Sequence, residues 1–444
     1  MPDSIGTKIT PVVFIKQVQY RILSWAQLVR PAVLFYFRWV KLYVTMKKLL
    51  LICCLLQVQV VLAQSTTYNY KDLLYYQHAL YLRTPSVYLN AAGARAQAGD
   101  TAAAIGFIRE AIALHLYDTN AVCTDNKLKF ITQTRYWAPL RKSILANRAG
   151  LGDPNQMQVV TSDIASFWKV FDQAHKPGAD KLIMDEYIMK GSQGLRTLFE
   201  VRMKTQVSRI VETIRTHKTY FESIRPVTLQ LHRLAPRMIE AARKLKALYP
   251  AAIFPPTTFS IGVFGALGTP DGYSGQLIGA EFLCDSNTVN KAALSDRERM
   301  GLTDTSTLFS VLIHELIHVE QQTAASNTLL AQSVNEGAAD LITWLLLGYH
   351  LNNQQHAYGN AHEAALWTRF KQQMNGEDVS EWLYNSRTAP PGIPGDLGYY
   401  MGYKICEAYY NKASDKKQAV KDMLTIADFG RFLEQSGYGP EGRQ

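Results

Sequence analysis

Apolar residues recur at helical spacing through most of the chain. Residues 164–248 follow a period of three to four, and Pro226 and Pro236 within them predict kinks or helix ends. The stretches 308–319 and 341–347 are apolar at most positions, which predicts two further helices. The pattern therefore predicts a mostly helical protein.

Two shorter runs have the composition of strands. Residues 258–264 and 276–283 are rich in apolar and β-branched side chains, and the turn-rich segment 268–272 separates them. We expect these runs to pair as a hairpin with a long loop. The predicted fold class is therefore α+β, mostly helical with a small sheet.

The region before residue 152 carries a pattern of short helices. Small residues lie at helix-pair spacing on both sides of a Gly-Asp turn at 98–100, and this resembles one tetratricopeptide-type hairpin. The alternative is an all-α cap that packs on the next domain. Residues 152–155 (Gly-Asp-Pro-Asn) are the best linker candidate, so we expect a helical, tetratricopeptide-like region over 64–152 and a second domain over 153–444.

Composition is that of a globular protein with an excess of positive charge. Hydrophobic residues make up 47% and charged residues 19%, which excludes wholesale disorder, and the formal net charge is +10. Residues 1–63 hold eight basic residues and one acidic residue, so 39 basic and 36 acidic residues remain in 64–444. No basic cluster interleaved with aromatic residues remains there, so we expect no nucleic-acid partner.

The N-terminal charge belongs to an export signal. Residues 46–63 combine Met-Lys-Lys, an apolar run and a small residue before Gln64, which is the pattern of a secretory signal peptide. Residues 1–45 are then an upstream stretch before the true start; the alternative is an amphipathic anchor on a membrane surface. We expect an exported, periplasmic or extracellular protein without a stable membrane span in the mature chain.

Candidate chemistry lies in the helix predicted over 308–319. His314 and His318 are four residues apart, so both imidazoles lie on one helix face, where they can bind one zinc ion. Glu315 lies beside the first histidine and can reach a metal-bound water without being a ligand. Residues 304–307 offer an N-cap for this helix.

A second segment supplies a third ligand. Residues 335–340 (Asn-Glu-Gly-Ala-Ala-Asp) are expected to start another helix, eighteen residues after His318. Glu336 is placed to complete a site of two histidines and one carboxylate, with the fourth position left to water. Asp340, one turn on, would accept the second ring N–H of a ligand histidine. Gly337 would remove bulk where two helices approach the metal. Zn²⁺ is thus the expected cofactor.

This combination of motifs resembles the gluzincin group of metallopeptidases. More narrowly, it is similar to the predicted zinc-dependent proteases of the DUF2268 kind, which are related to gliding-motility lipoprotein B-like proteins of the Bacteroidetes. The resemblance covers roughly 180–444, and the segments that carry it are 314–318, 330–340, 395–405, 409–410 and 415–417.

The resemblance implies a zincin-like metallopeptidase domain, in which the edge strand of a small sheet lies above the active-site helix. Residues 276–283 are the expected edge strand, which would bind an extended peptide by backbone pairing. Glu281 on this strand is expected to face solvent. His362 and the phenols of Tyr399, Tyr400 and Tyr403 are the candidates for stabilising the oxyanion, and the sequence does not choose among them.

The sequence thus predicts an exported zinc metallopeptidase that hydrolyses peptide bonds. His314, His318 and Glu336 would bind Zn²⁺, and Glu315 would accept the proton of the attacking water and pass it to the leaving amine. The alternative is a non-catalytic cell-envelope or motility-related interaction protein with a structural or vestigial zinc site, which would bind a protein partner through its N-terminal helices. Glu315 argues against it, because a structural site needs no such residue.

Overall fold

The computed structural model describes residues 79–439, so the predicted upstream stretch 1–45 and signal peptide 46–63 lie outside the described residues. Helices dominate the described part, and short strands form two small sheets. This confirms the predicted α+β, mostly helical class. Between residues 79 and 439, no helix combines the length and the apolar character needed to cross a bilayer.

The N-terminal helices contain a hairpin at the predicted place. The turn between its two helices is Ala98–Asp100: Gly99 has φ of +74°, and Asp100 caps the second helix by accepting from the Ala103 N–H at 3.0 Å. Buried residues between Leu89 and Ile144 form an apolar cluster of their own, separate from the main core. The tetratricopeptide resemblance and the 152/153 domain boundary stay predictions. The α-helices of this region are α5 (Pro85–Gln97), α6 (Thr101–Ala113), α7 (Asn120–Cys123) and α8 (Trp137–Gly150).

The two prolines lie at helix ends. Pro226 lies in the last turn of α13 (Lys218–Thr228), and Pro236 lies in the first turn of α14 (Ala235–Leu248). In a first turn the missing backbone N–H costs least. The α-helices of this stretch are α9 (Ser162–Phe171), α10 (Ala179–Leu182), α11 (Gln193–Val201), α12 (Val207–Thr216), α13 (Lys218–Thr228) and α14 (Ala235–Leu248).

The larger sheet has the strand order β1–β2–β4–β3. Its members are β1 (Val159–Val160), β2 (Thr257–Ser260), β3 (Gly268–Asp271) and β4 (Gly275–Gly279). β2 is parallel to β1 and β4, and β3 is antiparallel to β4. The predicted hairpin of 258–264 with 276–283 is therefore wrong. Those runs are parallel neighbours, and parallel neighbours need a connection that brings the chain back; the segment predicted as a turn provides it as β3.

β3, and not 276–283, is the edge strand beside the helix that contains His314 and His318. The prediction that 276–283 is the edge strand is wrong, because β4 is hydrogen-bonded to a strand on each side. The Gly279 N–H donates to the Leu267 C=O at 2.8 Å. Since bonded and non-bonded positions alternate in an antiparallel pair, Gly268 turns its own N–H and C=O toward the free edge.

Glu281 organises the loop that leads into β3. The sequence predicts that the Glu281 side chain faces solvent, but Glu281 is only 2% exposed. The chain leaves β4 in a short 3₁₀ turn that directs this side chain inward. Its carboxylate accepts from the backbone N–H groups of Gly262 and Phe264, each at 3.0 Å. These bonds hold Phe264 with φ of +53°, a conformation that side chains other than glycine rarely adopt.

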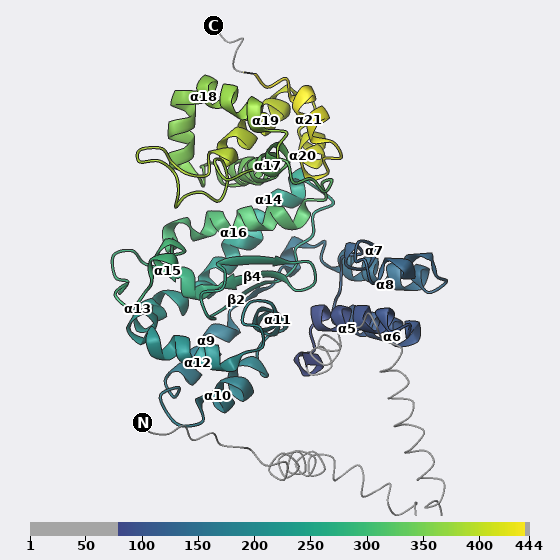
Figure 1. Ribbon diagram of the computed structural model, residues 1–444, viewed down its shortest axis with the longest axis vertical. Coiled ribbons are helices and arrows are strands. Elements are labelled where there is room, and N and C mark those ends of the chain that lie inside the picture. The colour runs from purple at the N-terminus through teal and green to yellow at the C-terminus, as the bar shows by residue number, and fades with distance from the viewer. Residues whose placement is uncertain (1–78, 440–444) are drawn as a thin grey trace, which may run out of the picture. The chain divides into compact units, whose positions relative to one another are not determined.

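α16 (Thr305–Glu320) lies between the sheet and the C-terminal helices (Figure 1). It packs against β3 and β4 on one side and against α17 (Leu329–Leu347) on the other. Asp304 caps α16 by accepting from the Ser306 N–H at 2.8 Å, within the predicted N-cap segment. The remaining elements are β5 (Leu283–Cys284), α15 (Asp296–Met300), β6 (Thr303–Asp304), α18 (Asn353–Gln373), α19 (Leu397–Lys412), α20 (Lys416–Leu424) and α21 (Phe429–Ser436).

α17 starts earlier than predicted. The expected start at Asn335 is wrong, because the Thr328 hydroxyl caps the helix by accepting from the Ala331 N–H at 3.3 Å, and the leucines that follow Thr328 are buried. Glu336 therefore lies in the middle of a helix and has no capping role. Gly337 does allow a close helix contact, but with α19: a Cβ at Gly337 would lie 2.0 Å from the Gly402 carbonyl carbon.

Candidate metal centre

The structure brings the three side chains predicted as ligands together. His314 Nε2 lies 2.9 Å from His318 Nε2, and Glu336 Oε2 lies 3.2 Å from each of these nitrogens. The histidines occupy one face of α16, and Glu336 reaches them from α17. Within 79–439, this is the group of His, Cys, Asp and Glu side chains whose ligand atoms approach closely enough to hold an ion.

The spacing of these atoms suits a tetrahedral ion. Ligand atoms about 2.0–2.1 Å from zinc at tetrahedral angles lie about 3.3 Å from one another. The observed separations of 2.9 and 3.2 Å are close to that value. Two imidazoles and one carboxylate are also the donor set of catalytic zinc sites, which keep a fourth position for water. The residues therefore fit zinc.

Asp340 fixes the first histidine. His314 Nδ1 lies 2.8 Å from Asp340 Oδ1, within ion-pair distance, and within the described residues neither of these buried atoms has a hydrogen-bond partner. The Asn352 amide donates to the other Asp340 oxygen at 2.5 Å. Because a carboxylate only accepts, the proton of a neutral His314 belongs on Nδ1, and Nε2 turns its lone pair toward the cluster. This is the role that the sequence predicts for Asp340.

Gln321 does the same for the second histidine, and the sequence analysis missed it. The Gln321 amide nitrogen donates to the Asn335 C=O at 2.7 Å, so its oxygen faces His318 Nδ1 at 2.8 Å and accepts from it. His318 Nε2 is therefore also free to bind a metal. The position of Gln321, three residues after His318 and at the C-terminal end of α16, is a signal that could have identified Gln321.

The electrostatic field favours a cation at this point. Burial opposes protonation of His314, but the Asp340 and Glu336 carboxylates outweigh it and raise its pKa to about 10. Burial also opposes ionisation of Glu336, but the two imidazoles hold its pKa well below the usual range. The same carboxylates that stabilise a proton here stabilise a divalent ion.

Glu315 lies beside the cluster but is not part of it. A Cβ on Gly268 would be 3.3 Å from Glu315 Cδ and 3.5 Å from its Oε1, so the carboxyl group lies against the edge strand. The side chain is half-buried. Glu315 thus follows His314 in α16 and lies in contact with the edge strand β3.

Three of the four predicted oxyanion candidates make their contacts elsewhere. His362 is exposed and stacks on Tyr358 with ring centroids 4.1 Å apart. Tyr400 and Tyr403 are buried and pack against the ring of His356 at 5.6 and 4.5 Å. Neither the imidazole of His362 nor these two phenols contacts a ligand of the cluster in the described structure.

Two other phenols do contact the cluster. The Tyr399 ring stacks on His314 with centroids 6.1 Å apart, and burial raises the pKa of Tyr399 far above its usual value. The Tyr384 hydroxyl donates to Glu336 Oε1 at 3.3 Å. Tyr384 is missing from the predicted set because it lies in a loop with no helical or strand pattern.

The loop holds Tyr384 in a strained conformation. Tyr384 and Asp396 have φ of +58° and +60°, unusual for residues other than glycine. Asn385 and Asp396 fasten the loop to itself: the Asn385 N–H donates to Asp396 Oδ1 at 3.0 Å, and the Asp396 N–H donates to Asn385 Oδ1 at 2.7 Å. Strain retained next to a cluster of ligands is typical of functional sites.

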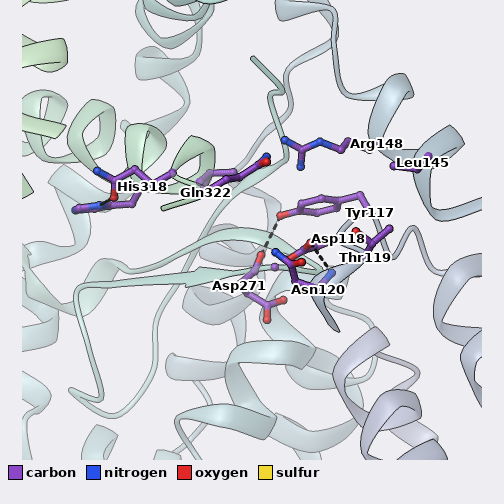
Figure 2. A pocket seen from close by; sticks show the side chains of 12 residues that line it. Tyr117, Asp118, Thr119, Asn120, Leu145, Arg148, Asp271, His318 and Gln322 are labelled. Carbon is purple, nitrogen blue, oxygen red and sulfur yellow. Dashed lines mark hydrogen bonds between the residues drawn. The ribbon is translucent and has the colours of Figure 1, made fainter. Parts of the chain in front are cut away.

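A cavity of about 320 Å³ opens beside His318. Figure 2 shows its walls, which come from the end of α16, the end of β3 and the loop Tyr117–Asn120 that precedes and enters α7. The Tyr117 hydroxyl donates to the Asp271 C=O at 3.0 Å. The N-terminal region therefore contributes a wall to the cavity beside His318.

Comparison with known families agrees with this centre. Residues 298–427 match the family model described as predicted Zn-dependent protease (DUF2268), and the matched stretch includes the cluster, Glu315 and Tyr384. This confirms over these residues the family resemblance seen in the sequence. The comparisons with curated proteins and with solved structures give no match.

Proposed function

We propose that this protein is a zinc-dependent metallopeptidase. One observation carries the proposal: two imidazole nitrogens and a carboxylate oxygen converge within 3.2 Å of one another, and the carboxyl group of the neighbouring Glu315 lies against the edge strand β3. A structural zinc site has no use for that edge or for a spare carboxylate.

His314, His318 and Glu336 would hold the ion. When bound, zinc supplies a Lewis acid that lowers the pKa of a water molecule and polarises a carbonyl oxygen. Glu315 acts on the substrate side as general base and then as general acid: its carboxylate takes a proton from the attacking water and delivers it to the leaving amine. Asp340 and Gln321 keep both imidazoles in the required tautomer.

The substrate would bind as an added strand along β3. Gly268 offers an outward N–H and C=O to an extended peptide and carries no side chain that would separate the peptide from Glu315. Backbone pairing at Gly268 would then place a peptide carbonyl within reach of Glu315.

The Tyr384 phenol would donate a hydrogen bond to the oxyanion that forms during attack. Its hydroxyl is 3.3 Å from a Glu336 oxygen, and its side chain is 63% exposed, so it can turn toward a bound substrate without breaking a core. Tyr399 packs behind His314 and supports the ring.

Glu315→Gln provides the test. The variant should bind one equivalent of zinc, as the wild type does, and lose peptide cleavage almost completely, because the amide cannot accept a proton. Glu336→Gln should instead lose zinc affinity. Zinc content by metal analysis and a peptide-library cleavage assay measure both. Full cleavage by Glu315→Gln would refute the mechanism, and stoichiometric zinc without cleavage of any peptide by the wild type would favour the non-catalytic alternative.

We also propose that the protein is exported and that the signal peptide 46–63 is removed. N-terminal sequencing of the protein recovered outside the cytoplasm should begin at Gln64. An N-terminus upstream of Met46 would contradict this.

A further inference from the structure

A second cavity, of about 850 Å³, adjoins the other end of the edge strand. Gly265 and Leu267, which directly precede β3, form part of its wall. Gly265 lies three positions before Gly268 in the chain, so their Cα atoms are at most roughly 11 Å apart. An extended peptide on β3 would therefore reach this cavity about three residues from the bond beside Glu315.

The cavity is strongly basic. Its wall contains Arg202, Lys204, Arg209 and Arg297, and within residues 79–439 none of the four forms an ion pair. Glu298 is the acidic residue among those lining the cavity. It is already engaged, because it accepts from the Ser295 N–H and hydroxyl, each at 2.7 Å. Four cationic groups thus face one hollow with little compensation.

The basic residues are tied to the edge strand. The Arg202 guanidinium Nε donates to Thr269 Oγ1 on β3 at 2.9 Å, and a Cβ on Gly265 would lie 3.1 Å from Arg202 Cβ. The backbone turns sharply beside it, since Lys204 and Thr205 have φ of +52° and +56°. Such a conformation is costly and is kept where the surrounding structure demands it. The position of Arg202 relative to β3 is therefore set by the fold.

The other end of β3 differs. The cavity beside His318 contains Asp118 and Asp271 together with one arginine, Arg148, which lies 4.0 Å from the buried Glu320. The cleft along β3 is therefore basic at the Gly265 end only, which gives a bound chain a direction.

We propose that the Arg202–Lys204–Arg209–Arg297 cavity is a specificity subsite for acidic side chains, so that the substrates are peptides with Asp or Glu about three residues from the cleaved bond. This rests on the proposed peptidase function. Carboxylates would pair with guanidinium and ammonium groups that form no ion pair within residues 79–439.

The proposal can be tested with two fluorogenic peptides. They differ only in having Glu or Gln at the residues about three positions from the cleaved bond. The wild type should cleave the Glu peptide with a kcat/KM about tenfold higher, and salt should reduce the difference. The variant Arg202→Gln/Lys204→Gln/Arg297→Gln should lose the preference. The control Arg141→Gln/Lys142→Gln/Lys169→Gln, which changes three exposed basic residues elsewhere, should keep it. Equal rates on both peptides, or an unchanged preference in the cavity variant, would overturn the proposal.

A binding measurement separates this proposal from the peptidase proposal. Fluorescence anisotropy with the Glu315→Gln variant reports affinity for the two labelled peptides without turnover. About tenfold tighter binding of the Glu peptide, lost in the cavity variant, supports the subsite even if the wild type cleaves neither peptide. Equal affinity for both peptides contradicts the proposal. A single-stranded oligonucleotide that displaces the Glu peptide and binds as tightly as that peptide also contradicts it, because the cavity would then be a general polyanion site.

Discussion

A loop holds Tyr384 next to Glu336, which we propose as a metal ligand. The hydroxyl of Tyr384 is the group that we propose stabilises the oxyanion. Tyr384→Phe keeps the ring and removes the hydrogen bond to Glu336, so zinc content should stay unchanged while kcat falls by about 100-fold, the cost of one oxyanion donor. Steady-state kinetics with parallel zinc analysis measure this. Tyr349→Phe, a change at another exposed tyrosine, serves as the control and should behave as the wild type. An unchanged kcat in Tyr384→Phe would remove Tyr384 from the mechanism.

Glu281 makes stability depend on pH. Burial raises its pKa from 4.5 to about 7, although the backbone hydrogen bonds from Gly262 and Phe264 act in the opposite direction. A carboxyl group whose pKa is higher in the folded state contributes its full stability below pH 4.5 and loses it as pH rises through about 7. The wild type should therefore lose about 3 kcal/mol of unfolding free energy over that range relative to Glu281→Gln, which cannot titrate.

Urea denaturation of both proteins at pH 4.5 and at a pH just above 7 measures this difference. The zinc ligands titrate equally in the two proteins, so their contribution cancels in the comparison. Parallel pH profiles would show that Glu281 ionises in the folded state as it does in water.

At the scale of elements, the crossing of α17 and α19 depends on glycine. A Cβ on Gly402 would lie 1.7 Å from the Ser333 C=O, which is backbone and cannot move aside. Gly402→Ala should therefore lower the unfolding free energy by about 3 kcal/mol. It should also weaken zinc binding, because α17 carries Glu336. The matched control is Gly106→Ala on α6, where nothing lies within 4 Å of the added Cβ and helix propensity favours alanine by about 1 kcal/mol. Equal melting temperatures for the two variants would contradict this account.

The elements also show what the sequence could and could not predict. His314 and His318 were predictable because helix geometry alone places residues four apart on one face, and Asp340 follows Glu336 by the same rule. The edge strand was not predictable, because strand order depends on pairing between distant segments. In addition, β3 occupies a stretch whose glycines and proline indicate a turn. Tyr384 reaches Glu336 only through the tertiary fold, so no local pattern identifies it.

At the scale of the whole molecule, zinc should stabilise one part of the protein more than the other. The described residues contain two separate apolar clusters, one confined to 89–144 and one that includes α16 and α17. The proposed metal ligands lie on α16 and α17 only. A free zinc concentration of about a hundred times the dissociation constant stabilises the zinc-binding state by about 2.7 kcal/mol. Local opening of the protein can be measured segment by segment.

Removal of zinc with a chelator should therefore increase hydrogen exchange in 305–347 and leave α6 and α8 almost unchanged, because their backbone amides belong to the cluster that contains no ligand. Hydrogen exchange followed by mass spectrometry, with and without the chelator, measures both regions in one experiment. The same experiment tests the predicted boundary at residues 152/153, since protection should change between α8 and β1. A uniform loss of protection from α5 to α21 would show that the two clusters unfold as one unit and that the N-terminal helices are an integral part of the metal-binding domain.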